Sequence, residues 1–60
     1  MKKFILRIGN WNKTIYLEDV KEIIPIEEEK RIPKHGDPYT WQRCRVIFID
    51  GTSAEGERTF

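Results

Sequence analysis

Residues 40–49 alternate between two faces, and this period-two pattern constrains the fold more than any other feature of the sequence. One face would carry Thr40, Gln42, Cys44, Val46 and Phe48, and the other Trp41, Arg43, Arg45, Ile47 and Ile49. The following Asp50-Gly51 pair is typical of a two-residue hairpin turn. We therefore expect a returning strand from Thr52 to about Glu55, with residues 55–60 either fraying or bringing Phe60 against a neighbouring subunit.

The first part of the chain has the same period. Phe4, Leu6 and Ile8 alternate with Lys3, Ile5 and Arg7, and strand-forming residues resume at 14–17. Turn-forming residues fill the segment 9–12 between them. This pattern predicts a hairpin with a longer loop that contains Trp11.

A third strand is expected from about Val20 to Lys30, after a tight turn at Glu18-Asp19. Pro25 would then lie on a sheet edge or at a bulge, where its missing N–H costs no ladder bond. A short helix over 19–24 is the alternative, because Val20, Ile23 and Ile24 also have helical spacing. Residues 32–39 predict an ordered loop, since prolines restrict its backbone.

Together these segments predict an all-β fold with at most one short helical turn near 19–24. We expect one domain, residues 1–60, built as a small antiparallel β-meander or half-barrel of four to five strands. A chain of this length has little core, and a single cysteine provides no disulfide framework. Pairing between subunits would both add burial and remove open strand edges. The sequence therefore predicts a homo-oligomer that completes the sheet.

The residue inventory argues against catalysis and metal binding. Cys44 and His35 are the only cysteine and histidine, and Cys44 shares a face with Val46 and Phe48. A packed thiol is therefore expected rather than a nucleophile. No metal-ligand spacing occurs, so we predict no catalytic residue, no metal and no cofactor. The lone cysteine and the lack of long apolar runs favour a cytoplasmic protein that makes no membrane contact.

The net charge of +1 conceals two blocks of opposite sign. Residues 18–29 carry six acids and one base, whereas residues 31–45 carry four bases and one acid. A duplex-binding protein would show a basic excess over the whole domain, so extended duplex binding is disfavoured. The simplest interpretation is that the blocks solvate the surface and pair across strands or subunits.

Flat rings and hydrogen-bond donors concentrate between residues 34 and 45. Arginine forms bidentate, charge-assisted bonds with phosphate, and tryptophan or tyrosine stacks on a planar base. Residues from elsewhere in the sheet, or from a second subunit, could complete such a site. The predicted ligand-binding residues are Trp41, Arg43, Arg45, Tyr39, His35, Lys34, Trp11 and Arg58. Aromatic and arginine side chains are also enriched in protein interfaces, which is the alternative interpretation of this face.

Three functions are compatible with these features. The first is a non-catalytic oligomer that binds or sequesters a small anionic, nucleotide-like ligand through the aromatic and arginine face. The second is a protein-interaction module or small inhibitor that acts through the acidic block or an exposed edge strand. The third is a small barrel that binds single-stranded nucleic acid, against which the near-neutral charge argues.

Overall fold

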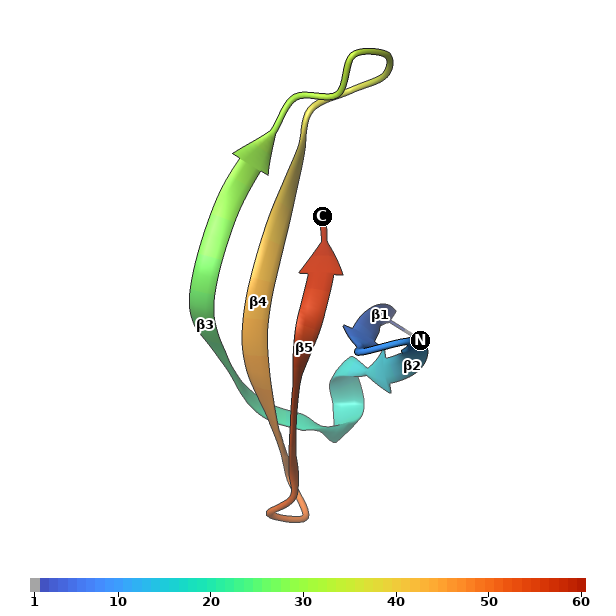
Figure 1. The fold of residues 1–60 in the computed structure, drawn as a ribbon. Helices are drawn as coiled ribbons and strands as arrows, with labels where there is room; N and C mark the ends of the chain where they lie inside the picture. Colours follow the sequence, from blue (N-terminus) through green and yellow to red (C-terminus); the bar gives the residue numbers. More distant parts are fainter. Residues whose placement is uncertain (1) are drawn as a thin grey trace.

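Five antiparallel strands form one open sheet in the computed structural model, which describes residues 2–60. They are β1 (Lys3–Ile8), β2 (Trp11–Tyr16), β3 (Val20–Arg31), β4 (Tyr39–Phe48) and β5 (Ser53–Thr59). The order across the sheet is β2-β1-β5-β4-β3, with β2 and β3 at the edges (Figure 1). The all-β prediction is confirmed with five strands. Within residues 2–60, no helix has the length and apolar character needed to span a membrane.

The turn between β1 and β2 is shorter than predicted. Ile8 pairs with Trp11, so Gly9 and Asn10 alone reverse the chain. Gly9 has a φ of 61°, which suits the first central position of a type II′ turn. The prediction that Trp11 lies in a long loop is wrong, because a left-handed glycine allows a two-residue turn and makes Trp11 the first residue of β2.

The turn and strand predicted after β2 are confirmed. A 3-10 turn, η1 (Leu17–Asp19), leads directly into β3, and no helix forms over 19–24. Val20 and Ile23 are partly buried against the core from an extended backbone. β3 is an edge strand, and its register against β4 shifts between Pro25 and Glu27. Pro25 thus lies both on an edge and at a bulge.

Asp50-Gly51 ends β4 as predicted, but the loop has three residues rather than two. The Phe48 N–H donates to the Thr52 carbonyl (2.8 Å), and the Gly51 N–H donates to the Phe48 carbonyl (3.0 Å). Gly51 has a φ of 93°, so the loop combines a tight turn with one left-handed residue. Asp50 accepts bonds from the Thr52 hydroxyl (2.6 Å) and N–H (2.9 Å), which hold the pKa of its carboxyl below the ordinary value.

β5 is longer than predicted and does not fray after Glu55. It pairs with β4 from Ser53 to Thr59, and Phe60 then exchanges two hydrogen bonds with Thr40, of 2.8 and 2.9 Å. The prediction of a frayed end is wrong because β4 supplies backbone partners along the whole segment. A polar sequence does not prevent such pairing, since the ladder bonds are made by the backbone.

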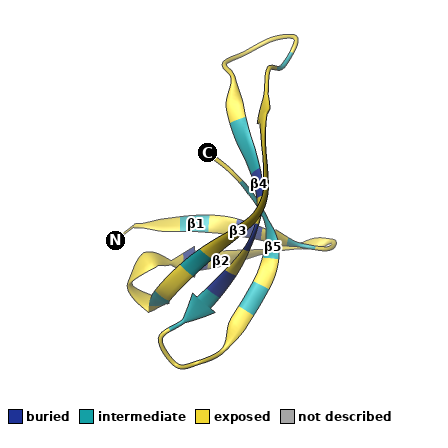
Figure 2. Cartoon of the chain, turned by 90° about the vertical axis from the view of Figure 1, so that its left-hand side faces the viewer, coloured by how far each residue is buried: buried dark blue, intermediate teal, exposed yellow. Residues whose placement is uncertain are grey.

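The core is small and lies where the β1–β2 hairpin meets β4 and β5. Leu6, Ile15, Cys44 and Val46 are at most 1% exposed. Partly buried side chains surround them: Phe4, Ile8, Val20, Ile23, Phe48 and Ala54. Figure 2 shows that the outer end of the β3–β4 hairpin extends beyond this core. That outer end carries mostly exposed residues.

Cys44 provides a direct check on this core. Burial raises the pKa of its thiol above the ordinary value of 9.0, an effect that the charge of Arg58 partly offsets. We expect the native protein to react with a thiol reagent at neutral pH at least about a hundredfold more slowly than the chain in urea. Because the thiol pKa is higher in the folded protein than in the unfolded chain, the ionisation of Cys44 does not lower the free energy of unfolding at neutral pH. It lowers that free energy once the pH rises past the unfolded pKa. Fast, stoichiometric labelling of the native protein would contradict the packing of Cys44.

Candidate anion-binding groove

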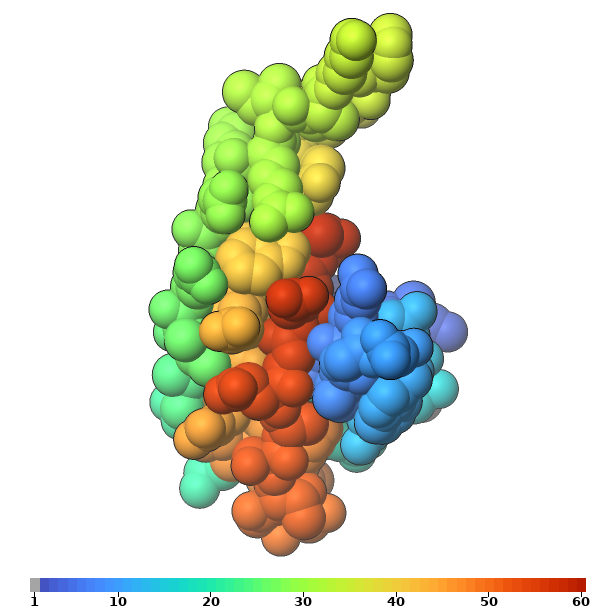
Figure 3. All heavy atoms as spheres, in the orientation of Figure 1, coloured from blue at the N-terminus to red at the C-terminus, as the bar shows by residue number. Residues whose placement is uncertain are grey.

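A groove of about 530 Å³ opens where the end of β5 separates from β1. β1 and β5 share a single register pair, Arg7 with Glu57, so the residues of β5 beyond it have no partner on that side. Figure 3 shows β5 (red) between the β1–β2 hairpin (blue) and β4 (orange). The groove residues come from all five strands, and together we call them the Trp41 groove: Ile5, Arg7, Asn12, Arg31, Tyr39, Trp41, Glu57, Arg58 and Thr59.

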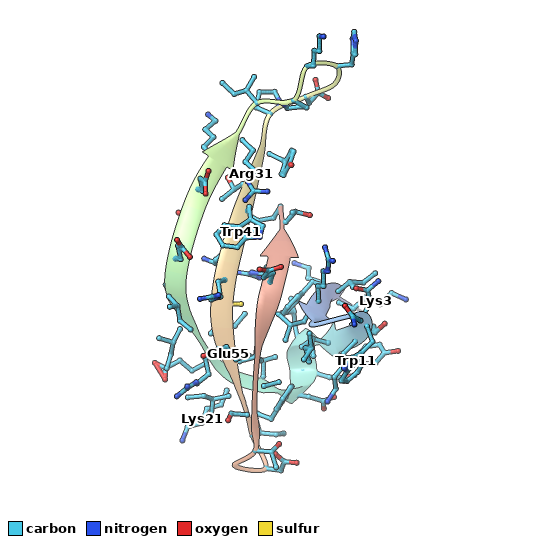
Figure 4. The ribbon with its side chains drawn as sticks, in the orientation of Figure 1. Lys3, Trp11, Lys21, Arg31, Trp41 and Glu55 are labelled. Atoms are coloured by element: carbon cyan, nitrogen blue, oxygen red, sulfur yellow. The ribbon has the colours of Figure 1, made fainter. Side chains whose placement is uncertain are left out.

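Trp41 and Arg31 form a stack at the outer end of this groove. The guanidinium carbon of Arg31 lies 4.9 Å from the centroid of the Trp41 ring (Figure 4). A guanidinium over an indole face is attracted by the ring electrons. Arg31 also approaches Glu29 at 3.8 Å, but both side chains are largely exposed, so this ion pair is weak. The stack therefore positions the Arg31 charge beside the groove.

Arg58 is held in place by three contacts. Its Nε donates a hydrogen bond of 2.7 Å to Oε1 of Gln42. Its guanidinium carbon lies 4.9 Å from the ring centroid of Phe4 and 4.8 Å from that of Phe60. Two aromatic faces and one hydrogen bond thus restrict the orientation of the guanidinium plane.

Gln42 connects Arg58 to the edge strand. It is 5% exposed, and its Nε2 donates a hydrogen bond of 2.9 Å to Oε1 of Glu28. The amide can satisfy both neighbours because it offers one acceptor to Arg58 and one donor to Glu28. Two hydrogen bonds, which run from Glu28 on β3 through Gln42 on β4, therefore hold the side chain of Arg58 on β5 in place.

The terminal nitrogens of Arg58 remain available. Within residues 2–60, neither of them makes a hydrogen bond, and no carboxylate lies within 4.0 Å of the guanidinium. The side chain of Arg58 lies with Gln42 and Phe4 on the face of the sheet opposite Trp41, because Arg58 alternates with Glu57 and Thr59 along β5. On the Trp41 face, Arg7 and Arg31 supply two positive charges and Glu57 one negative charge, which leaves a net charge of +1. A fixed guanidinium fork beside aromatic rings suits an anion that also carries a planar group.

The structure brings together only some of the predicted site residues. Trp41, Tyr39 and Arg58 all border the groove, but the guanidinium of Arg58 lies on the opposite face of the sheet with Gln42 and Phe4. Arg43 lines a smaller hollow beside it, between the register partners Glu27 and Glu57. Arg45 lies farther along β4 and pairs with Glu55 at 3.3 Å.

The other three predicted residues lie outside the groove. Lys34 and His35 belong to the loop at the tip of the β3–β4 hairpin, the loop farthest from the core in Figure 1. Trp11 begins β2 and is 56% exposed. None of the three lines the Trp41 groove.

Sequence reasoning missed six residues of the groove: Arg7, Arg31, Ile5, Asn12, Glu57 and Thr59. Alternation in the first strand already placed Ile5 and Arg7 on the face opposite Leu6. Alternation within one strand does not show which strand lies next to it. The pairing of β1 with β5 joins residues fifty positions apart, and it was therefore not predicted. The described residues contain no group of three side chains suited to holding a metal ion.

Comparisons with known proteins identify no similar protein. No family model matches the chain, and neither the curated proteins nor the solved structures include a match. The functional proposal therefore depends on the groove itself.

Proposed function

We propose that this protein is a non-catalytic binding protein that holds a small anionic, ring-bearing ligand of the nucleotide class around the open end of β5, with the ring in the Trp41 groove and the anionic group on Arg58 at the opposite face. The observation that carries the proposal is Arg58, which is clamped between Phe4 and Phe60 and bonded to Gln42. Its terminal nitrogens are left for a ligand. A side chain that is already ordered loses little conformational entropy on binding, which favours affinity.

The two faces of the sheet at the end of β5 would hold the two parts of such a ligand separately. A phosphate accepts a bidentate pair of hydrogen bonds from Arg58 on the Gln42 face, and Arg7 and Arg31 supply positive charge on the Trp41 face. A base stacks on Tyr39 or extends the stack of Arg31 on Trp41. Such a protein would act by sensing or sequestering its ligand rather than by transforming it.

A titration with a panel of small ligands tests this function. Isothermal titration calorimetry with AMP, ADP, ATP, a cyclic mononucleotide and inorganic phosphate separates ring recognition from phosphate recognition. We expect at least one nucleotide to bind more tightly than phosphate. The Trp41→Ala variant should bind that nucleotide about tenfold or more weakly, because stacking contributes roughly 1–3 kcal/mol per base.

Trp11→Ala is the matched control, since Trp11 is exposed and lies outside the groove. Its affinity should equal that of the unmodified protein. Absence of nucleotide binding, or equal losses in the two tryptophan variants, would refute the proposed site. Much tighter binding of a short single-stranded oligonucleotide would favour a nucleic-acid module in its place.

A second candidate function is a protein-interaction module. The observation that favours it is the outer edge of β3, which no other strand of residues 2–60 covers and which carries Glu27, Glu28 and Glu29. An open edge can accept a strand from another chain. Reversing the charge of Glu27, which takes no part in the Glu28–Gln42–Arg58 chain, would then weaken association in a salt-dependent manner and leave nucleotide titrations unchanged.

A further inference from the structure

The isolated chain exposes more surface than a monomer of its mass normally does. Its accessible surface is 4799 Å², and its mass is 7.2 kDa. The scaling relation for folded monomers gives about 4,100 Å² at this mass. The excess of about 700 Å² is close to the roughly 800 Å² that each partner buries in an interface of standard size. This surface is sufficient for association with a second chain.

The outer half of β3 is where that surface can be covered by strand pairing. The inner part, residues 20–26, has register shifts after Val20 and at Ile26 and contains Pro25, which lacks an N–H. Register shifts and proline residues hinder the pairing of an edge strand with a strand of another chain. Residues 27–31 instead pair regularly with β4 and contain no proline. Apolar side chains flank this stretch, with Ile26 50% and Ile32 78% exposed.

The sequence of this half is complementary to itself. From Ile26 to Ile32 it reads Ile-Glu-Glu-Glu-Lys-Arg-Ile, with acids before the centre and bases after it. If a second copy pairs antiparallel about an axis at Glu29, Glu28 faces Lys30, Glu27 faces Arg31, and Ile26 faces Ile32. Opposite charges and apolar pairs directly across strands are stabilising. An axis at Glu28 would instead place Glu27 opposite Glu29, and this like-charge pair would destabilise the dimer.

The backbone is oriented for the same register. Thr40 exchanges both of its backbone hydrogen bonds with Phe60, so its N–H and C=O point away from β3. Lys30 is the register partner of Thr40, and it therefore directs its own N–H and C=O outward. Alternation along the strand does the same for Glu28. The residues that face each other across the axis are thus those with free backbone groups.

From these observations we propose that β3 pairs with β3 of a second copy over residues 27–31, about a two-fold axis at Glu29, with Ile26 and Ile32 flanking the paired stretch. This pairing would join two five-stranded sheets into one. The proposal does not depend on a ligand in the Trp41 groove. Its one unfavourable pair is Glu29 against Glu29 on the axis, which Arg31, 3.8 Å from Glu29 in the same chain, partly offsets.

Cross-linking of a single-cysteine variant at the axis tests the register. In a non-hydrogen-bonded antiparallel pair the Cα atoms lie about 4.5 Å apart, which is within the range that a disulfide spans. We expect Glu29→Cys to form a covalent dimer under mild oxidation at least about tenfold faster than Glu22→Cys, an exposed control on the same strand. Cys44 is buried and does not compete. Equal rates for the two variants would overturn the proposed register.

Charge variants examined by sedimentation equilibrium test the energetics. Lys30→Glu converts both Glu28 to Lys30 pairs into like-charge pairs, so the dimer Kd should rise about tenfold or more. Adding Glu28→Lys to it should restore the dimer, and Glu29→Gln should strengthen it. The proposal is overturned by a chain that sediments as a monomer at every concentration. It is equally overturned by a dimer that is indifferent to Lys30→Glu.

Discussion

Replacing Gly56 by alanine is expected to destabilise the protein by about 3 kcal/mol or more, the upper part of the range for overpacking. A Cβ at this position would lie 2.5 Å from the backbone oxygen of Arg7 and 2.9 Å from Cγ of Leu6. The backbone oxygen cannot move aside without shifting β1. Since β1 is joined to β5 by one register pair, the whole β1–β2 hairpin would be displaced.

The consequence extends to the core because the hairpin carries Leu6 and Ile15, two of its four buried side chains. A chain of this length is stable by only about 3–9 kcal/mol, so Gly56→Ala should be largely or partly unfolded without denaturant. Gly9→Ala is the matched control: its positive φ costs an alanine about 1–2 kcal/mol, but nothing lies within 4 Å of the added atom. Urea unfolding monitored by tryptophan fluorescence measures both. If Gly56→Ala costs no more than Gly9→Ala, the close contact of β5 with β1 is wrong.

Replacing Arg58 by glutamine is expected to lower affinity for the tightest nucleotide of the panel about a hundredfold, equivalent to about 2.7 kcal/mol. The variant loses the guanidinium fork, and each hydrogen bond to a charged group contributes roughly 1.5–3 kcal/mol. Arg58→Lys retains the charge but not the bidentate geometry, so its affinity should be intermediate. Calorimetry on the three proteins gives the comparison.

Arg43→Gln is the matched control for this substitution. Arg43 is an exposed arginine on the neighbouring strand and lies outside the groove. It should change affinity by less than about threefold, as expected of an exposed charge without ligand contact. If the Arg43 and Arg58 variants lose affinity equally, the protein attracts anions through general positive charge rather than through one oriented guanidinium.

The fold was predictable where side-chain alternation carries the information. The alternation of residues 40–49 predicted β4 and its two faces, and Cys44 and Val46 are indeed buried while Arg43 and Arg45 are exposed. Pro25 predicted an edge or bulge for a reason that requires no tertiary information, since proline lacks a backbone donor. Local chemistry was sufficient for both predictions.

Features that depend on strand pairing were not predictable in this way. β5 is polar, and it forms because β4 offers it a backbone ladder as far as Phe60. Gly56 is not in a turn, and its requirement for a missing side chain arises only where β1 crosses β5. Arg7 belongs to the groove for the same reason, because the pairing of β1 with β5 places it there, whereas the β3–β4 hairpin brings Arg31 beside Trp41. Arg58 was predicted as a site residue, but its clamping by Phe4 and Phe60 was not.

The central claim is that Arg58 is an ordered anion anchor before any ligand binds, and NMR of arginine side chains labelled with nitrogen-15 tests it most directly. The Arg58 Nε–H should give a distinct, slowly exchanging signal in the free protein, because it is hydrogen bonded to Gln42 between two rings. Titration with the tightest nucleotide should shift the Arg58 signals most, and those of Arg45 least, since Arg45 is paired with Glu55. An averaged, rapidly exchanging Arg58 signal that does not respond to the nucleotide would contradict the account.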